Sequence, residues 1–429
     1  MEYSDIFEAI ETKSDDTPSK TLKAIKNGDD VNLKNEYGEN FLHIIANIYS
    51  GENDSPFLIP VVFQLSIAGI KKNDKNHNGE TALHVAVQKF GMHALVRALL
   101  MIGVDPRVSS NNGEDIKEAI DEADTMTKTC VELLYPGLWN AVELEQDELV
   151  LRLVSSWCDL EETREGKSIM NLIHLNVNEK TVNMIEKSLP TRNLVYAALS
   201  RDKKMLKKAL KDPNADINTR NVSYIGYNNS VFFMPLVGEV ALLHLTSCLE
   251  KLLVCGADVN VIVDEVGSAE PLFLYVLKAL PPTEDAYDIL EILLPYANFS
   301  LCKKQTPMIC SIAFEKHLPF AVVKLMISQG LNLFGRDESG LTLRDKIYLE
   351  NFQQSKESLR FRLGFVDQIL VDIALERDME LLEKLCLNSH DYDQVKNKQG
   401  VPLIEAVSEK GHTDVVRFLE GLPELQVIL

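Results

Sequence analysis

Residue types that could perform catalysis are present in this chain, but their spacing forms no catalytic motif. Gly166-Lys167-Ser168 resembles the end of a phosphate-binding loop, in which the first glycine would stand at position 161. Glu161 occupies that position, so a backbone cradle for phosphate is not indicated. The acidic pairs Asp15/Asp16 and Glu161/Glu162 lie in polar turns, and the sequence contains neither H-E-x-x-H nor G-x-S-x-G. We therefore predict a protein that is not an enzyme and that uses no cofactor or metal.

Cysteine usage and hydropathy predict a cytoplasmic protein, with the nucleus as the alternative. The seven cysteines are an odd number, are scattered and form no C-x-x-C pair, which favours reduced thiols over disulfides or a metal site. The first residues carry neither the basic nor the apolar region of a signal peptide. The longest apolar run, residues 57–70, is shorter than the roughly 20 residues of a membrane span, so we expect no membrane insertion.

One pattern recurs along the chain and predicts helices in pairs. Its clearest copy is Asn78-Gly79-Glu80-Thr81-Ala82-Leu83-His84-Val85-Ala86, followed by Val96, Leu99, Leu100 and Gly103; the last copy lies between Gly400 and Leu419. Thr81 is suited to cap the N-terminus of a first helix. Apolar residues spaced three and four apart predict a second helix with one buried stripe. A glycine three or four residues later can end that helix in the left-handed conformation.

The expected helix-ending positions define the length of the repeat. They are Gly28, Gly69, Gly103, Gly256, Tyr296 and Gly330, with steps of 34 residues from Gly69 to Gly103 and from Tyr296 to Gly330. A chain of 429 residues would be oversized for one globular core, whereas a repeat array grows by contacts between neighbouring units. We therefore predict a single continuous array over residues 1–429, with degenerate repeats at 110–215, where the helix-capping element is missing.

The pattern resembles the ankyrin repeat, a unit of about 33 residues with a T-P-L-H-x-A signature at the start of its first helix. The resemblance implies an all-α solenoid of roughly twelve helix pairs joined by short β-hairpin turns. It also implies that His43 and His84 are structural, because the family uses this histidine to connect neighbouring turns by hydrogen bonds. In the family the turns project as fingers, which together with the first helices line a concave groove that binds other proteins.

The resemblance places the candidate binding residues in the turns, because loop residues on a rigid scaffold often determine specificity. An ordinary solvated turn is the alternative for each of them. The partner-binding residues that we predict are Tyr37, His77, Asn78, Asn111, Asn112, Arg336, Asp337 and Lys398, together with Tyr224 and Tyr227 of an insertion.

That insertion, residues 221–234, is rich in aromatic residues, and its Asn and Gly residues favour a β-hairpin. Aromatic side chains dominate the binding energy at the centres of interfaces. Burial of a phenylalanine side chain, on the other hand, stabilises a fold by roughly 1.5 to 3 kcal/mol. We expect Tyr224 and Tyr227 to be exposed, and Phe232 or Phe233 to be buried.

The net charge of −20 is concentrated in residues 1–150, which hold 13 Lys and Arg against 26 Asp and Glu. Such a field repels nucleic acid and anionic membranes, and it accelerates the approach of a partner with a basic surface. A general solubility role is the alternative. Six cations within residues 201–211 are a local exception, which a solvated helix face or an acidic or phosphate-rich partner would explain.

Together these observations predict a monomeric, non-catalytic scaffold that binds a partner protein through its concave groove and finger tips. The alternative is an adaptor or regulatory subunit of a signalling or ubiquitin-ligase complex, with this chain being the ankyrin region of a larger protein. Adaptors of this family carry a C-terminal box, for which residues 421–429 are too short.

Overall fold

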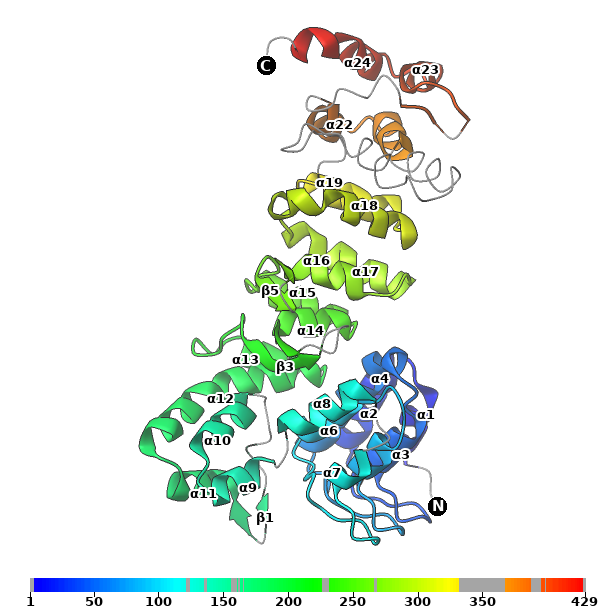
Figure 1. The fold of residues 1–429 in the computed structure, drawn as a ribbon. Coiled ribbons are helices and arrows are strands. Elements are labelled where there is room, and N and C mark those ends of the chain that lie inside the picture. The colour runs from blue at the N-terminus through cyan, green and yellow to red at the C-terminus, as the bar shows by residue number, and fades with distance from the viewer. Residues whose placement is uncertain are drawn as a thin grey trace. The chain divides into compact units, whose positions relative to one another are not determined.

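The computed structural model describes residues 4–120, 124–134, 137–155, 160, 163–164, 166–225, 231–265, 268–331, 367–386, 395–397 and 399–426. Regular structure in these residues is mostly helical, which confirms the predicted all-α repeat fold (Figure 1). The chain divides into two compact units, called here unit 1 (Met1–Asp258 and Ile262–Ala269) and unit 2 (Val259–Val261 and Glu270–Leu429). One continuous array over residues 1–429 stays a prediction.

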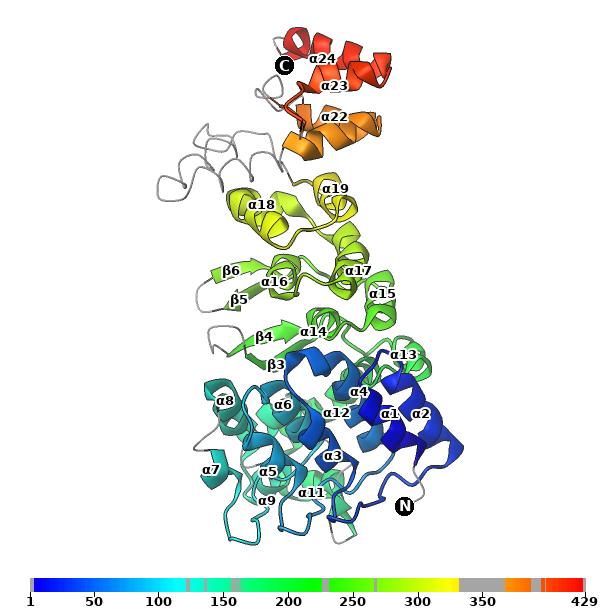
Figure 2. The same ribbon diagram turned by 90° about the vertical axis from the view of Figure 1, so that its right-hand side faces the viewer.

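The helices of unit 1 follow one another in pairs, as the repeat predicts. In the first four pairs the first helices α1, α3, α5 and α7 pack in one row, and the second helices α2, α4, α6 and α8 pack in another (Figure 2). The helices are α1 (Asp5–Thr12), α2 (Thr17–Asn27), α3 (Phe41–Ile48), α4 (Ser55–Ile67), α5 (Ala82–Val87), α6 (His93–Met101), α7 (Ile116–Ala119), α8 (Thr125–Leu134), α9 (Leu138–Glu143), α10 (Asp147–Ser155), α11 (Ile169–Asn176), α12 (Glu179–Leu199), α13 (Lys203–Ala209), α14 (Leu236–Leu242) and α15 (Thr246–Val254), with a 3-10 turn η1 (Glu52–Asp54) before α4.

The ends of these helices are where the repeat pattern places them. Thr81 is the N-cap of α5, which confirms its predicted role. The predicted glycine terminators are also confirmed, because each adopts a left-handed φ between +86° and +100°, where a β-carbon would be strained; they are Gly28, Gly69, Gly103, Gly256 and Gly330. Tyr296 instead ends a short 3-10 helix, η3 (Leu294–Tyr296), and is followed by an extended Ala297.

A second set of contacts in unit 1 joins residues far apart in the sequence, and we call it the seam. Helix α12 contacts both α4 and α14. Phe63 of α4 packs edge-on against Tyr196 of α12, with ring centroids 5.3 Å apart. The Tyr196 hydroxyl donates to the carbonyl oxygen of Met101 at 3.0 Å, and Gln64 Nε2 donates to the carbonyl oxygen of Ser200 at 2.8 Å. We expected each repeat to pack only against its neighbours in the array. Unit 1 differs, because the seam adds contacts between repeats that are far apart in the sequence.

The composition of α4 and α6 explains why the seam forms. A second helix of a free-standing repeat array needs only one apolar stripe, but in α4 (SPFLIPVVFQLSI) every residue from Leu58 to Leu65 is buried. Residues 95–101 of α6 are all buried as well. Among them is Arg97, whose Nη2 lies 2.5 Å from Oε1 of Glu239 in α14, so that the one charge offsets the burial of the other.

Three short two-stranded sheets occur in the described residues in addition to the helices. They are β1–β2 (Thr163–Arg164 with Lys167–Ser168), β3–β4 (Arg220–Ile225 with Val231–Pro235) and β5–β6 (Ile262–Glu265 with Ser268–Pro271). The insertion at 221–234 lies in β3–β4, where Tyr224 faces Phe232 across an antiparallel register. Met234 is fully buried. The side chains of Tyr224, Phe232 and Phe233 and all of Tyr227 lie outside the described residues.

Unit 2 continues with helix pairs of the same kind. Its described elements are α16 (Leu272–Ala279), α17 (Glu284–Leu293), η3, η4 (Phe299–Gln305), α18 (Thr306–Glu315), α19 (Phe320–Ser328), α22 (Met379–Cys386), α23 (Leu403–Glu409) and α24 (Thr413–Gln426), with further helical residues at 367–375. Its core includes the tilted ring pair Phe273 and Phe299, with centroids 4.8 Å apart. In neither unit does a described helix have the length and apolar character needed to span a membrane.

Candidate functional site

The candidate site is a row of three turns in unit 1, residues 35–39, 76–80 and 110–114, which we call the finger row. Each turn is closed by a hydrogen bond from the amide of its first residue to the carbonyl of its fifth. The N–O distances are 2.9 Å for Asn35 to Glu39, 2.9 Å for Asn76 to Glu80 and 2.8 Å for Ser110 to Glu114. Because the same bond closes all three turns, the fingers share one conformation.

Side chains inside each finger add to its rigidity. Asn35 Oδ1 accepts the amides of Tyr37 and Glu39 at 3.0 and 2.9 Å, and its Nδ2 donates to the Glu39 carboxylate at 2.7 Å. Asn76 makes the equivalent three bonds in the second finger, to the amides of residues 78 and 80 and to the carboxylate of Glu80. These asparagines are therefore occupied by the turn, and the residues at the tips remain available to a partner.

Neighbouring fingers are also joined directly to one another. The amide of His77 donates to the carbonyl of Tyr37 at 2.9 Å, and Asn111 Nδ2 donates to the carbonyl of His77 at 3.2 Å. The neighbouring fingers approach so closely that a β-carbon added to Gly38 would lie 2.7 Å from Cδ2 of the His77 side chain and 3.2 Å from its backbone nitrogen. A β-carbon on Gly79 would lie 2.6 Å from the backbone nitrogen of Asn111. The spacing of the fingers is therefore determined by their main chains.

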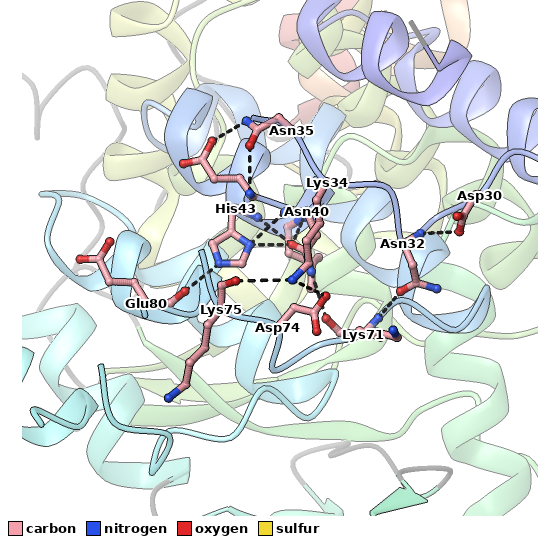
Figure 3. A network of polar contacts seen from close by, with 12 residues as sticks. Asp30, Asn32, Lys34, Asn35, Asn40, His43, Lys71, Asp74, Lys75 and Glu80 are labelled. Carbon is pink, nitrogen blue, oxygen red and sulfur yellow. Dashed lines mark hydrogen bonds and ion pairs between the residues drawn. The ribbon is translucent and has the colours of Figure 1, made fainter. Parts of the chain in front are cut away.

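Two buried histidines, His43 and His84, connect the finger row to the helices beneath it, as the resemblance predicted; Figure 3 shows the contact of His43 with Glu80. His43 Nε2 lies 2.9 Å from the carbonyl oxygen of Glu80, and His84 Nε2 lies 3.3 Å from that of Glu114. Burial lowers the pKa of both imidazoles below 6.5, which favours the neutral ring. Their predicted structural role is confirmed.

A ladder of asparagines before the fingers was not recognised in the sequence. Asn32 Oδ1 accepts the amide of Lys71 at 2.7 Å (Figure 3), and Asn73 Oδ1 accepts the amide of Asp105 at 2.7 Å. The same bond joins Asn218 Oδ1 to the amide of Asp258 in unit 1, and Asn260 Oδ1 to the amide of Asn298 in unit 2. The available signal was Asp-x-Asn after the helix-ending glycine, as in Asp30-Val31-Asn32 and Asp258-Val259-Asn260.

Five of the ten predicted binding residues lie together in the finger row. Tyr37, His77, Asn78, Asn111 and Asn112 are all exposed, and Tyr37 keeps 63% of its surface accessible. Tyr224 lies in β3, apart from the row in sequence, with its side chain outside the described residues. The other four, Tyr227, Arg336, Asp337 and Lys398, lie entirely outside the described residues. The structure therefore supports one contiguous candidate surface.

Metal-ligating residues and cysteine thiols are the remaining chemically reactive groups in the described residues. None of them forms a group of three or more His, Cys, Asp or Glu side chains that could hold a metal ion. The six described cysteines are thiols, and burial raises the pKa of Cys130 and Cys386 to about 12, which keeps these two protonated and unreactive. Lys167 lies on the two-residue strand β2 opposite Arg164.

Comparison with known proteins identifies the repeats. Residues 8–110 match the family model for ankyrin repeats, described as three copies. No curated protein matches the sequence. Among solved structures, the chain is similar to the crystal structure of the ankyrin repeat domain of Bcl-3, described as a unique member of the IkappaB protein family. That comparison has 15% identity, covers 67% of this chain and 98% of that one, and has a TM-score of 0.22, which is too low to carry an argument.

Proposed function

Because this chain is an ankyrin-repeat protein, with repeats matched over residues 8–110, we propose that it is a non-catalytic scaffold that binds a partner protein through its finger row. Ankyrin repeats are in general protein–protein interaction modules and are in general not catalytic. The finer proposal concerns which surface of this chain receives the partner.

The observation that carries the proposal is the burial of α4 and α6. In unit 1 these second helices are covered by the seam, where α12 and α14 lie against them. The first helices α3 and α5 expose little side-chain surface either, since residues 41–46 and 82–87 are all buried. The exposed surface of the repeats from α3 to α6 therefore includes the finger row and the polar side chains beside it, such as Asn47 and Gln88.

The rigidity of the row supports the same proposal. Every turn is hydrogen-bonded internally and to its neighbour, so little conformational entropy is lost when a partner binds. The tips combine an exposed tyrosine with exposed asparagine and histidine side chains, which are suited to hydrogen bonding and aromatic contact. The excess of acidic residues in 1–150 supports a partner with a basic surface. The buried thiols support a reducing compartment, and we propose the cytoplasm.

The test is site-specific photo-crosslinking in cells of the organism that makes the protein, followed by binding measurements with the purified partner. A photo-reactive amino acid replaces Tyr37 in one variant and the exposed Glu186 of α12 in the control. We expect one protein to be captured from position 37 and not from position 186. Its affinity should then fall at least tenfold in the triple variant Tyr37→Ala, Asn78→Ala, Asn112→Ala, without a change in thermal stability.

Two results would reject the proposal. One is capture of the same proteins from both positions, which would indicate contact by diffusion. The other is an unchanged affinity in the triple variant, which would place the binding surface elsewhere on the chain. Affinity that does not fall with rising salt concentration would reject the basic character of the partner while leaving the finger row in place.

A further inference from the structure

Two stripes of lysine occur on the surface of unit 1, in a protein whose net charge is −20. On α13 the exposed lysines Lys204, Lys207 and Lys208 recur at the three- and four-residue spacing of one helix face, and the exposed Lys211 follows just after the helix, while Leu206 and Ala209 are buried on the other face. On α2 the exposed lysines are Lys20, Lys23 and Lys26, opposite the buried Thr17, Thr21 and Ala24.

The fold joins these stripes, although about 180 residues separate them in the sequence. Asp202, the N-cap of α13, lies 3.6 Å from the ammonium of Lys26, and Arg201 Nη1 donates to the carbonyl oxygen of Asp15 at 3.2 Å. Both helices lie at the same edge of unit 1 in Figure 2. We call the two stripes together the basic surface.

Among the described residues, the ion pair within the basic surface is that of Lys26 with Asp202. Asp202 is already engaged, since its Oδ1 accepts the amides of Lys204 and Met205 while its Oδ2 approaches Lys26. Lysines four residues apart on α13 repel one another. Lys203 and Lys204 also lie in the first turn of the helix, where the macrodipole disfavours cations. The repulsion between lysines and the position of cations at the N-terminus both destabilise this short helix. A bound external anion would reduce both effects.

We propose that the basic surface is a second docking site, distinct from the finger row, and that its occupant is an acidic segment of a protein. The lysines of the basic surface complement carboxylates in charge, and they cover only a limited length. The helical residues of α2 and α13 extend over about 16 and 10 Å respectively. An extended peptide of about eight residues, at about 3.3 Å each, matches their combined length. Carboxylates at successive positions of such a peptide pair with lysines of both stripes.

The same dimensions disfavour the other polyanions. Duplex DNA carries a phosphate charge about every 1.7 Å and continues past the stripes, where it would meet the acidic remainder of residues 1–150. An anionic membrane is wider still, and α2 and α13 present no exposed large hydrophobic side chain that could enter it. A short acidic peptide is small enough to stay on the lysine faces of the two helices, between the carboxylates of Asp15 and Asp16 before α2 and Asp29 and Asp30 after it.

The probe for the test is a fluorescein-labelled deca-glutamate peptide, and the readout is fluorescence anisotropy with the full chain at about 50 mM and about 500 mM salt. We expect binding at low salt that is lost at high salt. In the triple variant Lys204→Glu, Lys207→Glu, Lys208→Glu the dissociation constant should rise at least tenfold. The matched control is Lys71→Glu, Lys180→Glu, Lys187→Glu, which changes the net charge equally at exposed lysines elsewhere in unit 1 and should change the constant less than twofold.

Several outcomes would overturn the proposal. One is the absence of peptide binding at low salt, and another is an equal loss of peptide affinity in the control variant. A third is tighter binding of a short DNA duplex, or of vesicles of one part phosphatidylserine to three parts phosphatidylcholine, that depends on the α13 lysines in the same way. A second variant, Lys207→Gln with Lys208→Gln, guards against misfolding of the charge-reversed helix and should weaken binding in the same direction. Variants of the finger row should bind the peptide normally, so failure of this proposal is distinguishable from failure of the proposed function.

Discussion

The seam makes a specific prediction about how unit 1 unfolds. In an array held together only by contacts between neighbours, removal of a core side chain loosens its own and adjacent repeats. Phe63 and Tyr196 are 1% and 4% exposed, and their rings meet although 133 positions separate them in the chain. The variant Phe63→Ala should therefore loosen α12 and α14 as well as α3 to α6.

The magnitude follows from the burial of the two rings. Truncation of a buried phenylalanine to alanine costs about 3 to 5 kcal/mol, which is a large share of the roughly 5 to 15 kcal/mol that stabilises a typical domain. The edge-on ring pair contributes about 0.5 to 1.5 kcal/mol beyond burial, so a double-mutant cycle of Phe63→Ala and Tyr196→Ala should show a coupling of that size.

The assay is native-state hydrogen exchange with mass spectrometry, combined with urea unfolding of each variant. We expect the exchange of peptides from α12 and α14 to rise in Phe63→Ala by a factor comparable to that of peptides from α3 to α6. The control is Leu403→Ala in α23, whose effect should be confined to unit 2 peptides around α22 to α24. The reasoning is refuted if exchange in α12 and α14 is unchanged by Phe63→Ala, or if the double-mutant cycle is additive.

Three further predictions concern the fold of the repeats. The folded-state pKa values of His43 and His84 lie below the ordinary 6.5, so the folded state binds fewer protons than the unfolded state. The free energy of unfolding should therefore fall as the pH drops below about 6.5. Urea unfolding between pH 7.5 and 5 should show this fall, and the fall should be smaller after His→Gln at both positions. Gly79→Ala should destabilise the protein by more than the roughly 1 to 2 kcal/mol that the left-handed conformation costs an alanine, because its β-carbon meets the next finger. Gly28→Ala has open space around its β-carbon and should show the conformational cost alone. Equal shifts in melting temperature for the two variants would contradict the close approach of the fingers. Lys316→Met should cost about 1 to 3 kcal/mol in thermal unfolding, since its ammonium donates to three carbonyls at the end of α16, and Lys316→Arg should recover part of the loss.

Much of the local architecture could be predicted from the sequence because it depends on residues within one repeat. Thr81, His84 and Gly103 lie within 23 residues of one another, and each has a role that follows from helix capping or from the left-handed region. The positions of the finger tips followed in the same way. The asparagine ladder could have been found too, because Asn32 and Asn260 occupy equivalent places after a terminator glycine.

The seam could not be predicted by the same reasoning, although one signal was present. The apolar run at 57–70 is too short for a membrane span, and its apolar residues point to more than one side of a helix. A second helix that is apolar on every side needs a second packing partner, and that partner is α12. Nothing in the spacing of residues 57–70 indicates which distant helix it is.

Short-range rules of capping, glycine conformation and apolar spacing were thus enough to establish that this is a helical repeat protein with exposed turns. The folded chain decided which faces of those repeats remain accessible and brought Lys26 of α2 within 3.6 Å of Asp202, the N-cap of α13. The physical reason is that periodicity acts between residues in adjacent turns and repeats. Contacts between residues more than a hundred positions apart depend instead on how two folded surfaces fit together. That fit is determined only after the repeats that form both surfaces have folded.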